Sequence, residues 1–176
     1  AAVRDLGVPE EFAGDIAALV AAKLASEPIE DLRLDLEDGY GDRGDEAEDA
    51  DVRQAAANLL EAVARGEAPA SVGVRIKSLE PATRGRSIRS LDLFVGTLLD
   101  GGSLPGGLVL TLPKVTAVAQ VEAMTRLCER LEQHHGLAAG RLRFELQVET
   151  PQVVLGADGT SPLPRAIRPG GGRGSG

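Results

Sequence analysis

The stretch Leu142-Arg143-Phe144-Glu145-Leu146-Gln147-Val148-Glu149 alternates apolar and polar residues from end to end. Successive side chains of a β-strand point to opposite faces, so this pattern predicts a strand with one apolar face and one polar face. Three earlier stretches have the same character. The four predicted strands span about residues 31–37, 71–77, 107–113 and 142–149.

Segments with helical periodicity separate these strands. Apolar residues recur at helical spacing between residues 52 and 63, 88 and 99, and 118 and 131, and a further helix is expected near residues 9–24. Strands that alternate with helices are typical of parallel crossover units. In an open parallel sheet, helices bury both faces and the strands become continuously apolar. The polar second face found here instead favours a barrel interior. We therefore expect an α/β fold, a partial (β/α)8 TIM barrel of about four βα units.

The length of the chain limits how many βα units it can contain. Eight units require roughly 250 residues, and 176 are present. The sequence begins with Ala1 rather than Met and ends in a Gly-rich stretch. We expect a fragment, with a partial barrel domain over residues 1–160 and a flexible Gly-rich tail over residues 161–176.

Composition excludes several classes of function. A net charge of −8, an aromatic content of 2% and the absence of Trp argue against nucleic-acid binding. No run of about 18 apolar residues and no signal peptide are present, so neither a membrane span nor secretion is expected. The single cysteine, Cys128, excludes an internal disulfide and fits a reducing compartment. We expect a cytoplasmic protein.

Acidic residues end the first and fourth predicted strands. Glu37 and Asp38 follow the first, and Glu149 closes the fourth. In a barrel these carboxylates lie at the carboxyl-terminal mouth, and hard cations prefer such oxygen ligands. The alternative for Glu149 is a structural ion pair with Arg75 or Arg143.

Basic residues end the second and third predicted strands. Arg75 has the planar fork that binds a substrate carboxylate through two hydrogen bonds. The alternative is that it neutralises an acidic neighbour, namely Asp35, Glu37 or Glu145. Two of only three lysines, Lys77 and Lys114, also occupy strand ends. A lysine there is a candidate Schiff-base nucleophile, which requires a lowered pKa, or a candidate ligand for an anion.

Other residues capable of chemistry have simpler interpretations. His134 and His135 lie at the end of a predicted helix, where cationic side chains interact favourably with the helix dipole. This interpretation is preferred to metal ligation. Cys128 falls on an apolar helix face and is expected in the core.

The strand ends resemble a known family. The runs Leu34-Asp35-Leu36-Glu37-Asp38, Val74-Arg75-Ile76-Lys77, Leu112-Pro113-Lys114-Val115 and Leu146-Gln147-Val148-Glu149-Thr150-Pro151 occur in order over roughly residues 30–152. They are similar to the HpcH/HpaI aldolase and citrate lyase β-subunit family, which includes malyl-CoA lyase, and look closest to a little-characterised branch of it. The resemblance implies a TIM barrel of the phosphoenolpyruvate/pyruvate type that makes or breaks a carbon–carbon bond beside an enolate, with Mg²⁺ as cofactor.

The resemblance also implies roles for individual residues. Arg75 would bind the carboxylate of a keto acid, Glu149 would be a metal ligand, and Glu37 and Asp38 would lie near the waters of the metal. Lys77 departs from the family, whose members usually have Asn there, and a second acidic metal ligand has no counterpart before Gly176. The candidates are therefore Glu37, Asp38 and Lys114 as catalytic residues, Arg75 and Lys77 as substrate ligands, and Glu149 as the metal ligand.

From this resemblance we expect a Mg²⁺-dependent carbon–carbon lyase or aldolase. Its substrate would be a small 2-keto acid or an acyl-CoA adduct, with coenzyme A as a candidate part of the substrate. Turnover by the chain itself should be weak or absent, since one carboxylate cannot hold Mg²⁺ firmly. We expect the full-length parent to form a homo-oligomer. Two alternatives stay open: an enzyme that transfers phosphate from phosphoenolpyruvate, and a non-catalytic half-barrel that assembles with a partner to cover its open edges.

Overall fold

The computed structural model describes residues 5–168 and 173. The chain forms two compact units, residues 1–31 and 32–176. The boundary predicted after residue 160 falls inside the second unit. Each unit is considered by itself.

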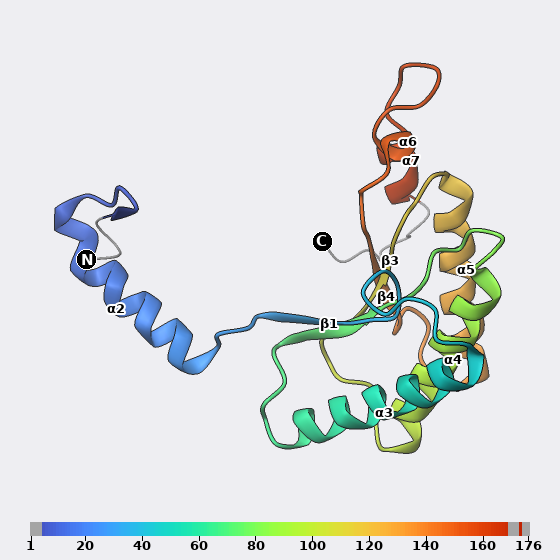
Figure 1. Ribbon diagram of the computed structural model, residues 1–176, viewed down its shortest axis with the longest axis horizontal. Coiled ribbons are helices and arrows are strands. Elements are labelled where there is room, and N and C mark those ends of the chain that lie inside the picture. Colours follow the sequence, from blue (N-terminus) through green and yellow to red (C-terminus); the bar gives the residue numbers. More distant parts are fainter. Residues whose placement is uncertain (1–4, 169–172, 174–176) are drawn as a thin grey trace. The chain divides into compact units, whose positions relative to one another are not determined.

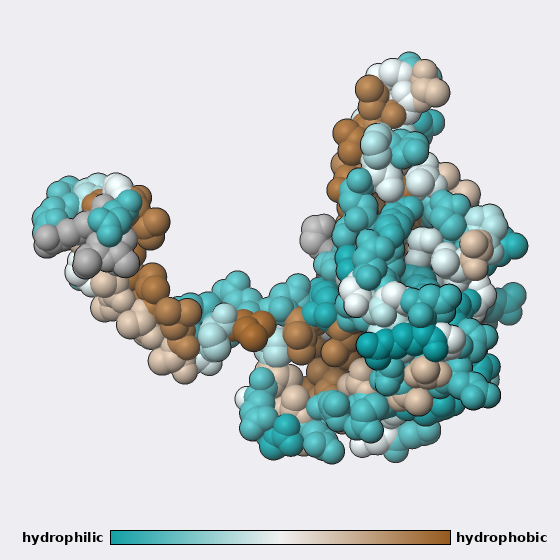
Figure 2. Space-filling view, in the orientation of Figure 1, coloured by the Kyte–Doolittle hydropathy of each residue, from teal (hydrophilic) through white to brown (hydrophobic). Residues whose placement is uncertain are grey.

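The first unit is built around one helix, α2 (Glu10–Ser26). Glu10 and Glu11 in its first turn and Lys23 in its last turn match the helix dipole. Lys23 also forms ion pairs with Glu27 and Glu30. The predicted helix is confirmed, but its apolar face is not buried within the unit. Figure 2 shows apolar side chains along α2, and the exposed large ones include Phe12, Leu19, Val20 and Leu24.

The second unit contains a four-stranded parallel sheet (Figure 1). The strands follow one another in chain order, β1-β2-β3-β4, so each neighbours the strand before it. The register places Val74 beside Leu110 and Leu110 beside Phe144. All four predicted strands are confirmed in type and order, with shorter bounds. They are β1 (Asp31–Asp35), β2 (Ser71–Arg75), β3 (Leu108–Leu112) and β4 (Arg143–Leu146).

Three long helices alternate with these strands. They are α3 (Asp45–Ala64), α4 (Arg84–Asp100) and α5 (Val118–His134). Gly66 and Gly136, just beyond α3 and α5, have φ of 69° and 65°, a conformation that glycine adopts without strain. The predicted helix ends at these glycines are therefore confirmed.

The core lies between one face of the sheet and these helices. Alternate residues of each strand point into it, and β3 is buried along its whole length. The other set of strand residues is polar except for Gly73 and Val109, and it forms the opposite face of the sheet, which we call the polar face. The core includes Val72, Val74, Leu110 and Phe144 from the strands, and Val52, Leu91, Phe94, Val121 and Met124 from the helices.

The chain after β4 differs from the expected tail. Two short helices follow, α6 (Pro151–Val154) and α7 (Leu163–Ile167), and the second lies inside the range predicted to be flexible. Ala166 of α7 is fully buried in the core, so apolar contact explains this helix. Arg173 is also buried and forms an ion pair with Glu132 at 2.6 Å. The remainder of the predicted tail, residues 169–172 and 174–176, lies outside the described residues.

Two further features concern single residues and helix composition. Cys128 is buried in the core as expected, and burial raises the pKa of its thiol to about 12, so it is not a reactive thiolate.

Among the described residues, the helices contain no stretch that is both long and apolar enough to cross a bilayer.

Candidate functional site at the carboxyl edge of the sheet

The carboxyl ends of the four strands lie at one edge of the sheet because the strands are parallel. Lys114, just after β3, contacts acidic residues that follow β1 and β4 at this edge. Its Nζ is 2.5 Å from Oε1 of Glu37 and 2.5 Å from Oδ1 of Asp38, both after β1. Its backbone N–H donates to Oε1 of Glu149, beyond β4, at 2.8 Å. The structure therefore brings four of the six predicted site residues into direct contact.

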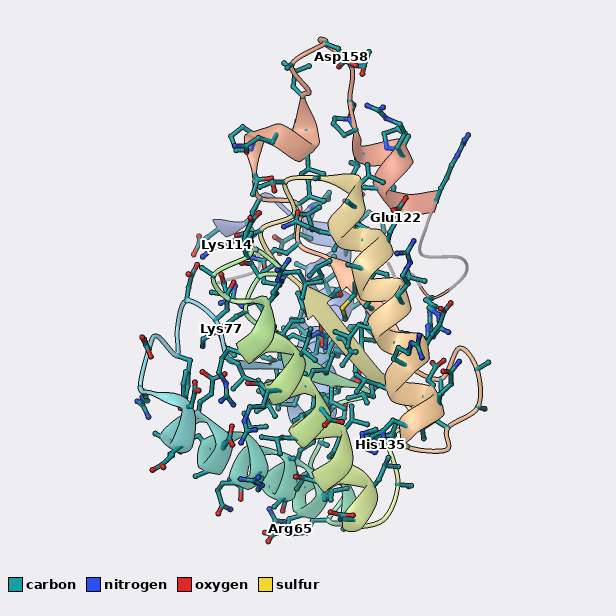
Figure 3. The ribbon with its side chains drawn as sticks, turned by 90° about the vertical axis from the view of Figure 1, so that its right-hand side faces the viewer. Arg65, Lys77, Lys114, Glu122, His135 and Asp158 are labelled. Carbon is teal, nitrogen blue, oxygen red and sulfur yellow. The ribbon has the colours of Figure 1, made fainter. Side chains whose placement is uncertain are left out.

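A cavity of about 410 Å³ opens at this edge. Its wall is formed by the loops after β1, β2 and β3 and by the first turn of α3 and α4. It includes Lys77, the fifth predicted site residue, and Figure 3 shows Lys77 and Lys114 at this end of the unit. The lining residues are Glu37, Asp38, Gly41, Asp42, Asp45, Glu48, Lys77, Ser78, Ala82, Thr83, Arg86 and Lys114.

Glu37 is the most unusual group in the cavity wall. Its side chain is only 6% exposed. One carboxylate oxygen, Oε1, pairs with Lys114, but Oε2 is buried and has no hydrogen-bond partner among the described residues. The guanidinium of Arg75 is the neighbouring cation, 3.9 Å away. A buried anionic oxygen without a hydrogen bond is costly unless a ligand or cation satisfies it.

Lys114 is held in an uncommon backbone conformation. Its φ of 51° lies in the left-handed region, where a residue with a Cβ is strained by roughly 1 kcal/mol. Hydrogen bonds to Asp38 and Glu37 raise the pKa of the ammonium above its ordinary value. Lys114 is therefore protonated at neutral pH, so it can bind anions and is not a neutral Schiff-base nucleophile.

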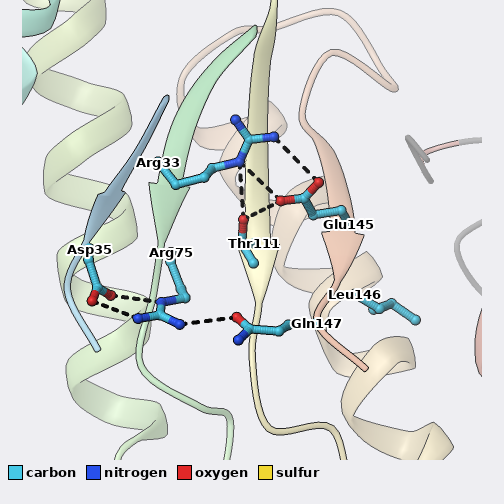
Figure 4. A pocket seen from close by; sticks show the side chains of 7 residues that line it. All are labelled: Arg33, Asp35, Arg75, Thr111, Glu145, Leu146 and Gln147. Atoms are coloured by element: carbon cyan, nitrogen blue, oxygen red, sulfur yellow. Dashed lines mark hydrogen bonds and ion pairs between the residues drawn. The ribbon is translucent and has the colours of Figure 1, made fainter. Parts of the chain in front are cut away.

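Arg75, the sixth predicted residue, lies on the polar face one step back from the edge (Figure 4). Its Nε and Nη2 donate to the two carboxylate oxygens of Asp35 at 2.8 and 2.6 Å, and Nη1 donates to Oε1 of Gln147 at 3.3 Å. This bidentate pair lowers the pKa of Asp35 to about 2. Of the partners considered for Arg75, Asp35 is the principal one. One N–H on Nη1 and one on Nη2 remain for a substrate carboxylate.

A second layer of charges crosses the polar face behind Arg75. Arg33 of β1 reaches over β2, and its Nε donates to Thr111 of β3 at 3.2 Å and to Glu145 of β4 at 3.0 Å. Thr111 in turn donates to Glu145 at 2.6 Å. Arg33 passes close to Gly73 on β2, where a Cβ would lie 3.4 Å from Cδ of Arg33. These two layers line a cavity of about 470 Å³ (Figure 4).

Sequence reasoning missed a group of charges that supports Lys77. Glu48 of α3 is 3% exposed, and its carboxylate lies 3.0 Å from Nζ of Lys77 and 3.1 Å from Nε of Arg86. Nζ of Lys77 also donates to the carbonyl of Leu36 at 2.6 Å. The neighbouring Asp49 pairs with Arg86 and Arg89. The available signal was the position of Glu48 one turn before Val52, on the buried face of a helix.

These contacts define what the edge can do chemically. It presents the ammonium groups of Lys77 and Lys114 and the guanidinium of Arg75 among several carboxylates, and Oε2 of Glu37 has no hydrogen-bond partner among the described residues. Such a surface suits a small anion together with a hard cation. A search of curated proteins found no match to this sequence. A family model described as "Domain of unknown function (DUF6986)" matches residues 1–176, so the chain belongs to the DUF6986 family.

Proposed function

We propose that residues 32–176 form part of a (β/α)8 barrel. Doubly wound sheets reverse their strand order at a switch point and carry helices on both faces. Here the strand order never reverses, and the long helices pack on the apolar face. The carbonyl of Arg173 accepts a hydrogen bond from the N–H of Phe144 at 3.1 Å, so the chain returns beside β4, where a fifth strand would lie. The polar face would then be the interior of the barrel.

The function we propose for this edge is Mg²⁺-dependent lyase or aldolase chemistry on a small 2-keto acid or its acyl-CoA adduct. The single observation that carries the proposal is the joining of Glu37, Asp38 and Glu149 through Lys114 at the carboxyl edge. Active sites of (β/α)8 barrels lie at this edge. The ordered strand-end motifs supply the reaction class by resemblance.

The residues present fit a hard cation in the type of donor that they offer. Glu37 Oε2 is a buried carboxylate oxygen without a hydrogen-bond partner, and each oxygen of Glu149 accepts one hydrogen bond, which leaves lone pairs free. Glu149 and Glu37 would hold the ion. When bound, Mg²⁺ would stabilise the negative charge of an enolate as a Lewis acid.

The basic residues would bind and orient the substrate. Arg75 would offer Nη1 to the keto-acid carboxylate while Asp35 fixes the rest of its guanidinium. Lys114, protonated between Glu37 and Asp38, would keep these carboxylates apart and balance their charge. Lys77, whose Nζ already contacts Glu48 and the carbonyl oxygens of Leu36 and Gly41, would add positive charge to the cavity wall.

Ligand-observed NMR can test this proposal even if binding is weak. The 176-residue chain is mixed with pyruvate or oxaloacetate, with and without Mg²⁺, and saturation transfer to the ligand is measured. We expect transfer that depends on Mg²⁺, and a loss of about tenfold or more in affinity for Glu149→Gln and Arg75→Lys. Lysine keeps the charge at position 75 but cannot reproduce the bidentate fork. Turnover should be weak.

The matched control is Glu122→Gln, which removes an exposed carboxylate from α5 outside both cavities. It should bind like the wild type, and circular dichroism should show that every variant is folded. Transfer that is independent of Mg²⁺, or unchanged in Glu149→Gln, would contradict the proposal.

The polar face also favours a second candidate, a half-barrel that binds a partner half without catalysing a reaction. The observation that favours this candidate is the 470 Å³ cavity on the polar face, where the charges already neutralise one another. Light scattering coupled to size exclusion distinguishes the two, because this candidate requires a mass above that of one 18.3 kDa chain. A monomer that binds keto acid would exclude it.

A further inference from the structure

The two histidines of the chain meet a carboxylate on a neighbouring helix. His134 ends α5 and His135 follows it, whereas Asp92 belongs to α4. Nε2 of His135 lies 2.8 Å from Oδ1 of Asp92, and the rings of the two histidines pack edge to face with centroids 4.8 Å apart. One ligand atom from each of the three residues lies within 4.8 Å of the others.

We propose that Asp92, His134 and His135 form a binding site for a borderline divalent cation of the Zn²⁺ class. Two imidazoles and one carboxylate are a common ligand set for Zn²⁺. Imidazole nitrogen selects Zn²⁺, Ni²⁺ or Cu²⁺ rather than Mg²⁺, which prefers oxygen ligands. This site is therefore chemically distinct from the carboxyl edge of the sheet. It does not depend on the function proposed there.

The surroundings of His135 keep the imidazole in place. Its side chain is 15% exposed and packs over α4. Gly96 lies one turn after Asp92, and a Cβ at Gly96 would be in van der Waals contact with Cε1 of the imidazole, 3.4 Å away. The ring therefore lies close against α4.

The geometry is within reach of tetrahedral coordination. Bonds of about 2.0–2.1 Å to Zn²⁺ place neighbouring ligand atoms roughly 3.4 Å apart. The His135–Asp92 distance of 2.8 Å is shorter than this, and the limit of 4.8 Å for the group is longer. His134 is exposed and can rotate to close the site, so three protein ligands would leave the fourth position to water.

Binding at this site would link α4 to the carboxyl-terminal end of α5. Figure 3 shows His135 well away from Lys77 and Lys114, so the ion would not contact a substrate in the other cavity. Its expected effect is on stability, because a cation that binds only the folded state shifts the unfolding equilibrium.

Isothermal titration calorimetry with ZnCl₂ alone tests the proposal. The 176-residue chain is prepared without a histidine tag and stripped with a chelator. With excess Mg²⁺ present to occupy sites made of oxygen ligands, we expect one equivalent of Zn²⁺ to bind and the melting temperature to rise. His134→Ala and Asp92→Asn should each weaken binding by about tenfold or more. Glu122→Gln should bind as the wild type does.

Substitutions at the other candidate site separate the two proposals. Glu37→Gln and Glu149→Gln should leave Zn²⁺ affinity unchanged. Absence of Zn²⁺ binding to the wild type would overturn the inference. So would equal affinity in the double variant His134→Ala/His135→Gln, or a loss of affinity confined to the Glu37 and Glu149 variants.

Discussion

Lys114 is the residue on which the carboxyl edge depends most. Its ammonium contacts Glu37 and Asp38, its N–H contacts Glu149, and its φ of 51° turns the chain between these contacts. Such strain persists only where the surrounding contacts compensate for it, and strained residues are often found at functional sites. The raised pKa of its ammonium indicates an electrostatic role.

Replacing Lys114 should show how much the buried charge of Glu37 lowers the free energy of unfolding when its partner is absent. In Lys114→Met the buried carboxylate loses its nearest counter-charge, and we expect the free energy of unfolding to fall by about 1–2 kcal/mol. Glu37→Gln in the same chain should recover most of this loss, because the buried group is then neutral. Urea unfolding of the two single variants and the double variant measures the coupling. Purely additive effects would show that Glu37 and Lys114 do not interact.

Asp35 should make stability depend on pH in the acid range. Its pKa is lowered to about 2 in the folded state, chiefly by Arg75, from an ordinary value of 3.8. The lowered pKa stabilises the folded state by about 2 kcal/mol above pH 5, and this contribution is lost as the pH falls through 3.8 toward 2. The stability difference between the wild type and Asp35→Asn should therefore shrink by more than half of that contribution from pH 5 to pH 2.5. A constant difference would contradict the assignment.

Among the elements, β2 is the strand whose sequence is most constrained by its neighbours. Gly73 lies beside Val109, and a Cβ on Gly73 would be 1.7 Å from the carbonyl oxygen of Val109. Arg33 passes over the same glycine to reach Thr111 and Glu145. The missing side chain allows the close approach of the two strands.

Gly73→Ala should be strongly destabilising. The clash with backbone atoms cannot be relieved without separating β2 from β3, and we expect a loss of about 4 kcal/mol or more in the free energy of unfolding. Gly85→Ala is the matched control. Gly85 lies in α4 with nothing within 4 Å of the added Cβ, so alanine should be stabilising by roughly 0.5–1 kcal/mol. Similar effects of the two substitutions on thermal unfolding would refute this account of the register.

The sequence predicted most of the elements because periodicity reports which faces are buried. The four strands, the three long helices and the glycines that end two of them were found in this way. The helix α7 was not, because it is only five residues long and is held by the burial of Ala166 rather than by its own periodicity. Short elements depend on contacts that a local pattern does not contain.

The site was predicted in part, for a related reason. Parallel strands guarantee that their ends meet at one edge, so the grouping of Glu37, Asp38, Lys114 and Glu149 followed from the strand assignment. The choice of ion-pair partners did not. Arg75 pairs with Asp35, while Glu145 pairs with Arg33 from across the sheet, and this pairing depends on the register of the strands. The proposed site of Asp92, His134 and His135 was not predicted, because it depends on the contact between α4 and the end of α5.

At the scale of the whole molecule, the second unit has one face that packs and one face that carries charge. Strands in unbroken order with helices on the apolar face are the arrangement from which a closed barrel is built. Under the proposed function, the charged face would line the interior of the barrel, and the carboxyl edge would form the active site. The proposed function involves only the second unit. In the first unit, the apolar face of α2 is not buried.

The most direct test of the carboxyl edge as a metal and keto-acid site is paramagnetic NMR with Mn²⁺, which replaces Mg²⁺ at oxygen ligands. Amide signals of the ¹⁵N-labelled chain are recorded during a Mn²⁺ titration in the presence of pyruvate. We expect signals from Glu37, Lys114 and Glu149 to broaden first, and excess Mg²⁺ to restore them. Broadening that spares these three residues, or that Mg²⁺ cannot reverse, would contradict the proposed function.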